Sequence, residues 1–563
     1  MHLGGRTAGD PSSVAGLFRE YFSELYVPSS GTCIQHGMLS TSSFSMGSVD
    51  ITEAMVAREL QSLDVSKGMG PDGVPPVLLR SCRESLTYPI FVLFRRSLES
   101  GVFPSSWKSA FITPIPKTSE RSKINGYRPV CSLSTLPKTL ERLMVKLMTP
   151  ALRNQLPLEQ HGFVAGRSCA SNLLTFQEFV LDAFSEGLQV DCIYTDFSKA
   201  FDRVDHRVLI EKLSSFGFHG VLLRWFEDYL RGRSMMVRVK STCSEPFVAT
   251  SGVPQGSHLG PLMFLIFVSD IGRVLSQGVS HLVFADDLKI FTTIRDEEDC
   301  GLLQESLESL GRWCVSNRLC LNTGKCSVVS FSRSSSPILT DYVIGGVLLR
   351  RGSSMRDLGV LFDNRLAFSD HVDQVCSKGM KMLGFVKRST RNFRDSSALL
   401  ALYTALVRPL MEFSTVVWSP GYGNARQALE RVQRRFLRYL SLRSGVPWED
   451  FDCGAMMAKT GLDSLELRRE LFDVLFLQKL IRNEVDSSLL LSRLNFYAPP
   501  YRTRQNQVFY MRSSPTNYLI NRPLSRMQRL YNRVASDVDA LDDLLQAPTG
   551  LFKRSVREVL RRH

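Results

Sequence analysis

The sequence lacks the cysteine patterns of a zinc-binding or disulfide-stapled protein. Its 12 cysteines include no CxxC pair and no zinc-finger or zinc-knuckle spacing. Cys314, Cys320 and Cys326 are evenly spaced but have no close fourth ligand, so we interpret them as half-buried small apolar residues. This pattern argues against a secreted, disulfide-rich domain and predicts an intracellular location, in the nucleus or the cytoplasm.

Long hydrophobic runs are missing as well. The most apolar segment, Pro261–Val268, is too short to cross a bilayer. The Gly-rich start, Met1–Pro11, has no apolar core of the kind a secretory signal needs. No long internal repeat and no compact basic cluster stands out. We therefore expect no membrane partner.

The sequence does have a surplus of positive charge. Its 563 residues include 69 Lys and Arg against 55 Asp and Glu, a net charge of +14. Such a surplus favours a polyanionic partner, although solubility alone would also account for it. The surplus is marked in the Arg-rich final quarter, which we expect to follow nucleic acid through its phosphates. The length predicts roughly two to four domains.

Two adjacent carboxylates, Asp286 and Asp287, form the centre of the chain's chemistry. They lie between the short apolar runs Leu282–Phe284 and Leu288–Phe291, a pattern typical of a tight β-hairpin with the acids at its tip. Taken alone, adjacent aspartates more often form a turn or cap a helix. A second apolar strand, from Val190, ends at another acid, Asp196.

Acids at the ends of two strands can converge in one sheet. Three carboxylates at one point repel each other, and a hard divalent cation is the usual reason for such a cluster. Mg²⁺ suits it because this ion takes few carboxylates and completes its shell with water and phosphates. Two such ions would stabilise a phosphoryl displacement, so the pattern favours nucleotidyl or phosphoryl transfer.

Basic and glycine-rich segments supply the other candidate contacts. Lys117 and Arg128 flank a loop where they could pair with a nucleotide's triphosphate. Arg167 and Ser168 could contact a nucleic-acid backbone. The segment 425–442 is a strongly basic helix, which is either a solvated face or a nucleic-acid track. Its arginines are Arg426, Arg431, Arg434, Arg435 and Arg438.

Taken together, the motifs resemble the reverse transcriptase of non-LTR, LINE-like retrotransposons, most closely the jockey-type group. The most specific of them are Asp196–Asp202, Ser251–Gly256 and Phe284–Asp287, in that order. Further motifs are Lys67–Gly73, Tyr127–Pro129, Gly162–Ser168, Leu358–Val360 and the span from Leu402 to Pro420. The resemblance runs from Val49 to the C-terminus.

The resemblance implies an α+β fold of the right-hand polymerase type, with fingers, a palm built on an antiparallel sheet, and a thumb, followed by a mostly helical C-terminal region. It implies two Mg²⁺ ions, with Mn²⁺ as the alternative, held by Asp196, Asp286, Asp287 and the Phe197 carbonyl. Because neighbouring residues on a strand point to opposite faces, we expect Asp286 to face the metals and Asp287 to contribute less directly.

The same resemblance assigns roles to further residues. Phe201 matches the bulky residue under the sugar that disfavours a 2′-hydroxyl, and it could also be a core aromatic. Gln255 and Gly256 would line the incoming nucleotide and template. Lys325 is a candidate acid for the departing pyrophosphate, although a surface lysine would look the same. We place Asp202 behind these residues, in a supporting position.

The predicted domain boundaries follow the motifs. Residues 1–48 are interpreted as a linker or a remnant of a longer polyprotein, and 49–97 as an N-terminal extension of the fingers. Residues 98–365 form the fingers and palm, 366–445 the thumb, and 446–563 a basic helical region. One departure is Phe284, which stands where Tyr is frequent. Another is the front of the chain, where residues 1–48 are too few for the endonuclease such elements carry.

The predicted function is that of an RNA-directed DNA polymerase that extends a DNA 3′-OH on an RNA template. Its partners would be the RNA template, a DNA primer or target, and deoxynucleotides. An element-encoded RNA-binding protein or an endonuclease supplied by another chain could join them. Two alternatives stay open, namely a telomerase-like or intron-maturase polymerase and a catalytically idle RNA-binding remnant.

Overall fold

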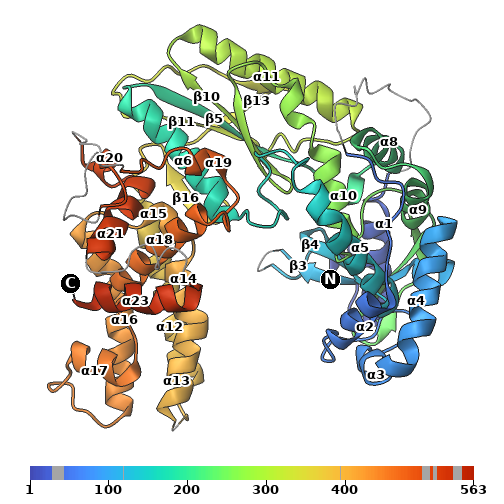
Figure 1. Ribbon diagram of the computed structural model, residues 1–563, viewed down its shortest axis with the longest axis horizontal. Coiled ribbons are helices and arrows are strands. Elements are labelled where there is room, and N and C mark those ends of the chain that lie inside the picture. Colours follow the sequence, from blue (N-terminus) through green and yellow to red (C-terminus); the bar gives the residue numbers. More distant parts are fainter. Residues whose placement is uncertain are drawn as a thin grey trace.

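The computed structural model describes the chain except for residues 28–43, 118–119, 394, 498–506, 512–515, 537–547 and 563. The molecule has three parts (Figure 1). A lobe built from the first half carries one β-sheet, a second sheet crosses the middle of the molecule, and a helical lobe follows on the other side. The two lobes stand on either side of the central sheet, so that the molecule has the outline of an arch.

The central sheet has five strands in the order β14-β11-β5-β10-β9. They are β5 (Gln189–Asp196), β9 (Ser280–Phe284), β10 (Asp287–Ile294), β11 (Ser327–Phe331) and β14 (Arg350–Arg351). All neighbours are antiparallel except β11 and β14. Since side chains alternate along a strand, Ile193 and Ile290 enter one core while Cys192 and Phe291 enter the other.

Each face of the central sheet is covered by helices. Helix α11 (Glu297–Ser316) packs Leu303 and Leu307 into the first core, together with α10 (Leu259–Val268). Helix α6 (Cys169–Ser185) covers the other face, where the rings of Phe176 and Phe291 lie 5.1 Å apart, edge to face. A sheet buried on both faces holds the ends of its strands rigidly.

The outer sheet belongs to the first lobe. Its order is β4-β3-β6-β7, and β8 pairs with β6. The strands are β3 (Ser109–Pro116), β4 (Tyr127–Leu133), β6 (Arg233–Val239), β7 (Thr242–Cys243) and β8 (Phe247–Ala249). Around it lie the helices α2 (Glu53–Gln61), α3 (Pro76–Ser81), α4 (Arg83–Ser100), α5 (Thr135–Leu152), α8 (His206–Phe216) and α9 (Gly220–Leu230).

The N-terminal segment differs from the predicted linker. Helix α1 (Pro11–Ser23) buries Phe18 and Phe22 against the outer sheet, and the Phe18 ring lies 5.0 Å from Tyr127. Asp10 caps this helix by accepting from the Ser13 amide. Residues 1–48 were interpreted as a linker or as a remnant of a longer polyprotein. For residues 1–27 the structure does not fit a linker, because their apolar face packs on a sheet far along the chain, while the remnant interpretation stays a prediction. The Ser/Gly-rich part, residues 28–43, lies outside the described residues.

The C-terminal lobe is helical. It contains α12 (Ser369–Ser389), α13 (Ser396–Leu402), α14 (Arg408–Glu412), α15 (Thr415–Trp418), α16 (Gly423–Arg443), α17 (Cys453–Thr460), α18 (Leu465–Ile481), α19 (Ser488–Leu491), α20 (Asn517–Ile520), α21 (Pro523–Ser536) and α23 (Thr549–Arg562). Helices on both sides of the predicted boundary at residue 445 share one core, so the structure shows no break there.

Charged side chains fasten this lobe to α6. Arg522 pairs with the fully buried carboxylate of Glu178 and, at 2.8 Å, with Asp182. Arg493 also pairs with Asp182. Because one of these carboxylates is buried, loss of its partner would leave an unpaired charge in the interior. The C-terminal helices are thus part of the same folded body as the central sheet.

Candidate active site

The two adjacent aspartates lie at a tight hairpin, as the pattern of apolar runs predicts. Strands β9 and β10 pair from Phe284 with Asp287, which leaves Ala285 and Asp286 as the turn. Ala285 has a φ of +59°, a conformation that is strained for a residue with a Cβ.

A neighbouring segment holds this strained turn. The side-chain oxygen of Gln160 accepts from the amides of Ala285, at 3.0 Å, and Gly162, at 2.8 Å. The His161 amide donates to the Val283 carbonyl at 2.9 Å. A Cβ on Gly162 would lie 2.3 Å from the Ala285 nitrogen, so only glycine fits there. The sequence did not predict this role of Gln160, because a hydrogen bond between a side chain and a distant main-chain amide leaves no pattern in the residues around it.

Asp196 and Asp286 line one open cavity of about 680 Å³. Asp287, the next residue, lines a separate small cavity of about 70 Å³ with Asn172 and Asp357. Within the described residues, no three His, Cys, Asp or Glu side chains are grouped as ligands for one metal ion. Asp287 nevertheless lies directly opposite Asp196 on the neighbouring strand, and burial together with the carboxylates of Asp286, Asp357 and Asp196 raises its pKa to about 6. The structure therefore brings all three predicted carboxylates to one end of the sheet, and the role of Asp287 as a ligand stays a prediction.

A segment after α11 completes the floor of the cavity beside Asp196. Two main-chain hydrogen bonds join this segment to the end of β5. The main-chain N–H of Asn322 donates to the Asp196 carbonyl at 2.7 Å, and that of Ser198 donates to the Cys320 carbonyl at 2.8 Å. The Lys325 ammonium lies 3.0 Å from Oδ2 of Asp196, and the Asn322 side chain donates to the same oxygen at 3.2 Å. Phe197 lines the cavity as well.

The electrostatics of this cavity suit a divalent cation. Burial, and the nearby carboxylate of Asp196, raise the pKa of Asp286, whereas the cations of Arg128 and Lys117 lower it. Two carboxylates in one cavity, one of them destabilised as an anion, are a donor set that a hard cation would stabilise. These residues fit the metal site that the sequence predicts.

Basic side chains form a further part of the cavity wall, called here the basic wall. They are Lys117, Arg128, Lys199 and Lys325. Partial burial and the neighbouring cations of Lys199, Arg128 and Lys325 lower the pKa of Lys117. Several cations around one cavity predict an anionic ligand, and a nucleotide's triphosphate is a ligand of that kind.

Lys199 was not singled out in the sequence, and neither was its partner. It has a φ of +57°, and its ammonium lies 2.7 Å from the Tyr21 hydroxyl and 4.6 Å from the centre of the Tyr21 ring. Tyr21 belongs to α1, so the N-terminal helix reaches the cavity through this contact. No motif in the sequence links residues that far apart.

The glycine-containing loop after β8 lies beside the basic wall. Gln255 donates from its side chain to Asp202 at 2.7 Å, and its carbonyl accepts from the Cys131 amide at 2.7 Å. Gly256 has a φ of +128°, and a Cβ there would lie 2.4 Å from the Cys131 carbonyl oxygen. Burial raises the pKa of Asp202 to about 6, and its side chain lies behind Gln255.

Phe201 lies between two other aromatic rings at the edge of the cavity. It stacks on Phe264 with ring centres 4.3 Å apart and meets Phe163 edge to face at 6.2 Å. Phe264 is fully buried, whereas Phe163 is exposed. Phe201 therefore has both a core contact and a face toward the cavity, so that the two sequence interpretations of this residue are compatible.

Arg167 and Ser168 have internal partners in the structure. The Arg167 side chain is only 2% exposed, pairs with Asp486 at 3.1 Å and donates to the Gln160 carbonyl at 2.8 Å. Ser168 caps α6 through a reciprocal bond with Ser171. The prediction that Arg167 contacts a nucleic-acid backbone is wrong for this conformation, because its guanidinium is buried and already paired.

The basic C-terminal region divides into two groups of arginines. Arg431, Arg434 and Arg435 are exposed along α16, as a nucleic-acid track requires. Others form internal ion pairs, namely Arg426, Arg468, Arg493, Arg522, Arg526, Arg533, Arg557 and Arg561. The expectation that the whole final quarter follows nucleic acid needs correction, since much of its charge is neutralised by internal carboxylates.

Comparison with known proteins gives a family for the part of the chain that carries the cavity. Residues 115–386 match the family described as reverse transcriptase (RNA-dependent DNA polymerase). The chain is 28% identical over 405 residues to the probable RNA-directed DNA polymerase from transposon BS of Drosophila melanogaster, covering 69% of this chain and 44% of that relative. It is 26% identical over 415 residues to the RNA-directed DNA polymerase from mobile element jockey of the same organism, covering 71% and 44%.

The chain thus spans less than half the length of these two relatives, with 44% of each covered. Among solved structures, the apo telomerase of Candida tropicalis is similar with a TM-score of 0.37 and 13% identity, over 73% of this chain and 68% of that chain. A likeness this distant carries no argument about activity.

The central sheet, with Asp196 and Asp286 at the strand ends, lies inside the segment that matches the reverse transcriptase family. The predicted α+β architecture, with an antiparallel central sheet and a helical C-terminal region, is confirmed. The relatives that the chain resembles are named as RNA-directed DNA polymerases of mobile elements, among them jockey. Among the described residues, no helix has the length and apolar content that a membrane span requires.

Proposed function

We propose that this chain is an RNA-directed DNA polymerase that extends a DNA 3′-OH on an RNA template by nucleotidyl transfer. One observation carries the proposal: Asp196 and Asp286 share a cavity with four cations from separate segments, Lys117, Arg128, Lys199 and Lys325. Carboxylates opposite cations are what a metal-bound triphosphate needs, and the relatives' names support the same chemistry.

The proposed metal ions are two Mg²⁺, with Mn²⁺ as an alternative. Asp196, Asp286 and the Phe197 carbonyl would hold them, with Asp287 contributing less directly. When bound, such ions acidify the attacking hydroxyl and stabilise the charge on the departing pyrophosphate.

The chain's own residues bind, orient and select the nucleotide. Lys117, Arg128 and Lys199 would bind the phosphates, and the Tyr21 hydroxyl fixes the position of Lys199. Gln255 and Gly256 would contact the nucleotide and the template. The Phe201 ring, supported by Phe264, would leave no room for a 2′-hydroxyl.

Lys325 would act as the proton donor to pyrophosphate. Its ammonium lies beside Asp196 and its side chain is mostly exposed, so that it could turn to a phosphate oxygen of the nucleotide. The proposed partners are an RNA template, a DNA primer or target and deoxynucleotides, and an endonuclease or RNA-binding protein could be supplied by another chain. Exposed arginines of α16 would follow the hybrid through its phosphates.

The test is primer extension on an RNA template with deoxynucleotides and Mg²⁺, comparing wild type with Asp286→Ala. Asp341→Ala, which removes an exposed carboxylate outside the cavity, is the matched control. We expect extension by wild type and the control, and its loss in Asp286→Ala. A well-folded wild type that binds the RNA–DNA hybrid but extends nothing would instead support the idle RNA-binding remnant.

A further inference from the structure

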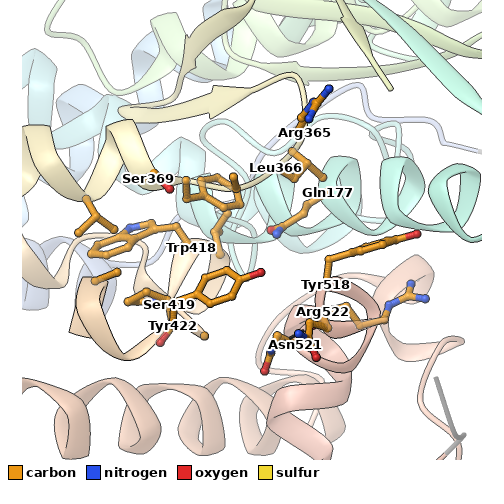
Figure 2. Close-up of a pocket in the computed structure, with 18 of the residues that line it drawn as sticks. Gln177, Arg365, Leu366, Ser369, Trp418, Ser419, Tyr422, Tyr518, Asn521 and Arg522 are labelled. Carbon is orange, nitrogen blue, oxygen red and sulfur yellow. Dashed lines mark hydrogen bonds between the residues drawn. The ribbon is translucent and has the colours of Figure 1, made fainter. Parts of the chain in front are cut away.

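A second cavity, of about 420 Å³, lies between α6 and the C-terminal lobe (Figure 2). Its walls come from five separate parts of the sequence. These are Gln177 and Leu181 of α6, Arg333, residues 365–373, residues 417–428 and residues 517–526. None of its lining residues lines the cavity of Asp196 and Asp286.

A buried amide points into this second cavity. Gln177 is only 4% exposed, and its side-chain oxygen has no hydrogen-bond partner among the described residues. Figure 2 shows its side chain between Trp418 and Tyr422 on one side and Tyr518 and Arg522 on the other. A buried, unpaired amide is costly unless a ligand supplies the missing bond.

Two long helices begin at the same cavity. Helix α12 starts at Ser369 and helix α16 at Gly423, and neither N-cap residue bonds the first amides through its side chain. At α16 the Ala425 amide donates to the Asn424 side chain at 2.8 Å, which leaves the amides of Gly423 and Asn424 at that end. Uncapped amides and the helix dipole make such ends attractive to a phosphate. The N-terminal residues Ser369, Asn424 and Ala425 all line the wall.

Free positive charge lies at the rim. Within the described residues, Arg365 and Arg333 make no ion pair with a carboxylate, whereas Arg522 and Arg526 are paired with acids of the fold. Arg333 donates to the Arg365 carbonyl at 2.8 Å and stacks on Tyr518 at 3.9 Å. Asp373 is the one acid on the cavity wall among the described residues, so the charge available to a ligand is net positive.

An aromatic surface completes the site. Tyr422, the residue just before α16, is 62% exposed, and its ring faces the cavity beside Gln177 (Figure 2). The face of a base can stack on such a ring whatever the sequence, while an amide with a donor and an acceptor reads the polar edge of the base.

From these features we infer that the cavity binds one unpaired nucleotide of a single-stranded RNA. The base stacks on Tyr422 with its polar edge at Gln177. The phosphate lies at the start of α12 and α16, near Arg365. The choice of RNA over DNA rests on the proposed function, whereas the nucleotide chemistry rests on the cavity alone.

The experiment measures binding of fluorescein-labelled single-stranded RNA homopolymers of A, U and C to the full chain. Fluorescence anisotropy is recorded with the polymerase cavity occupied by excess unlabelled RNA–DNA hybrid. Tyr422→Ala should weaken binding by about fivefold to a hundredfold, the usual cost of losing a stacked base. Arg365→Ala should make the slope of log K against log salt concentration less steep by about 0.7, the value for one contacted phosphate of a single strand.

The controls separate the site from general effects. Tyr88 is also 62% exposed but lies on α4, so Tyr88→Ala should leave binding unchanged. Gln177→Leu keeps the volume and removes the amide, and it should reduce the difference in affinity among the three homopolymers. RNA containing 5-iodouridine should crosslink to Tyr422 or Tyr518 of the wild-type chain. This measurement needs no substitution at a buried residue, so it stays valid even if Gln177→Leu disturbs the fold.

Three outcomes would overturn the inference. Unchanged affinity in Tyr422→Ala, with crosslinks only at residues elsewhere, would exclude the nucleotide site. Single-stranded DNA that binds as tightly as RNA and loses as much in Tyr422→Ala would refute the RNA assignment. If free AMP displaces the labelled RNA as well as unlabelled single-stranded RNA does, the cavity is a site for free nucleotides and the inference is wrong. Failure of the proposed function is distinct, since it would abolish primer extension while crosslinking at Tyr422 persisted.

Discussion

The ammonium group of Lys325 lies 3.0 Å from Oδ2 of Asp196, at the end of the strand that carries the first acid. A cation thus already balances the carboxylate that is expected to bind metal. Because the lysine side chain is 67% exposed, it can turn away toward a phosphate once the carboxylate has another partner.

Replacing Lys325 should separate its effect on chemistry from its effect on the metal. We expect Lys325→Ala to lower kcat by about 10²–10⁴, the range for loss of a general acid. The variant should bind Mn²⁺ as tightly as wild type or more tightly, because a competing cation is gone. Electron paramagnetic resonance titration measures that binding without turnover. Lys459→Ala, an exposed lysine of α17, should change neither quantity. An unchanged kcat in Lys325→Ala would contradict the assignment.

A smaller residue at position 201 should weaken selection against ribonucleotides. Phe201→Val removes the ring that stacks on Phe264 and opens space at the cavity. We expect kcat/KM for ribonucleotides relative to deoxynucleotides to rise by about 10–200-fold, the scale of a change in pocket volume. Steady-state kinetics with matched nucleotide pairs measures it. Phe385→Val, which removes an exposed ring of α12 outside the cavity, should leave the ratio unchanged. Equal shifts in both variants would argue against direct contact.

The glycine of the loop after β8 should not tolerate a side chain. Gly256→Ala places a Cβ 2.4 Å from the Cys131 carbonyl at a φ of +128°, so the loop must move and primer extension should fall. Gly278→Ala is the matched control, because its φ of +92° brings similar backbone strain with no atom within 4 Å. Circular dichroism melts and extension rates distinguish the two. Equal losses would show that strain alone, and not the clash with Cys131, is responsible.

The two groups of C-terminal arginines should respond differently to substitution. Arg434→Ala combined with Arg435→Ala should lower the salt slope of hybrid binding by about 0.9 for each phosphate that is no longer neutralised, with little effect on stability. Arg526→Ala should destabilise the fold, because its partner Asp473 is buried, and leave the salt slope unchanged. Filter binding across a salt series and thermal melts give the two readouts. A reduced slope in Arg526→Ala would place that residue on the nucleic acid.

A buried histidine should make stability depend on pH. Burial, with the cations of Arg167 and Lys289, lowers the pKa of His161 to about 3 from an ordinary value of 6.5. Between these values the unfolded chain binds a proton that the folded chain does not. The contribution of His161 is therefore complete above the unfolded pKa and is lost as the pH falls toward the folded one.

We expect the stability difference between wild type and His161→Gln to shrink by about 1.4 kcal/mol per pH unit on acidification between about pH 6 and pH 4. Denaturant unfolding at several pH values measures it. His2→Gln, at an exposed histidine, should give a difference that stays constant. A constant difference for His161→Gln would mean that the histidine is protonated in the fold.

The sequence alone was enough for the family, the order of the motifs and the hairpin of Asp286 and Asp287. Strong local signals explain this success: two short apolar runs indicate β9 and β10, and the polar break between them indicates the turn. For α1, by contrast, the local pattern could not show what the apolar face of the helix packs against, because its partner, the outer sheet, lies far along the chain.

Only the tertiary structure decided which charged residues are free to act. Arg167 and Arg522 look like Arg365 in the sequence, yet the first two pair with acids far along the chain while the third remains at the rim of a cavity. Gln160, Gln177 and Tyr21 acquire their positions in the same way, through contacts between distant segments. Local sequence determines which strands and helices form, whereas a charge or an amide becomes structural or available according to what the folded chain places beside it.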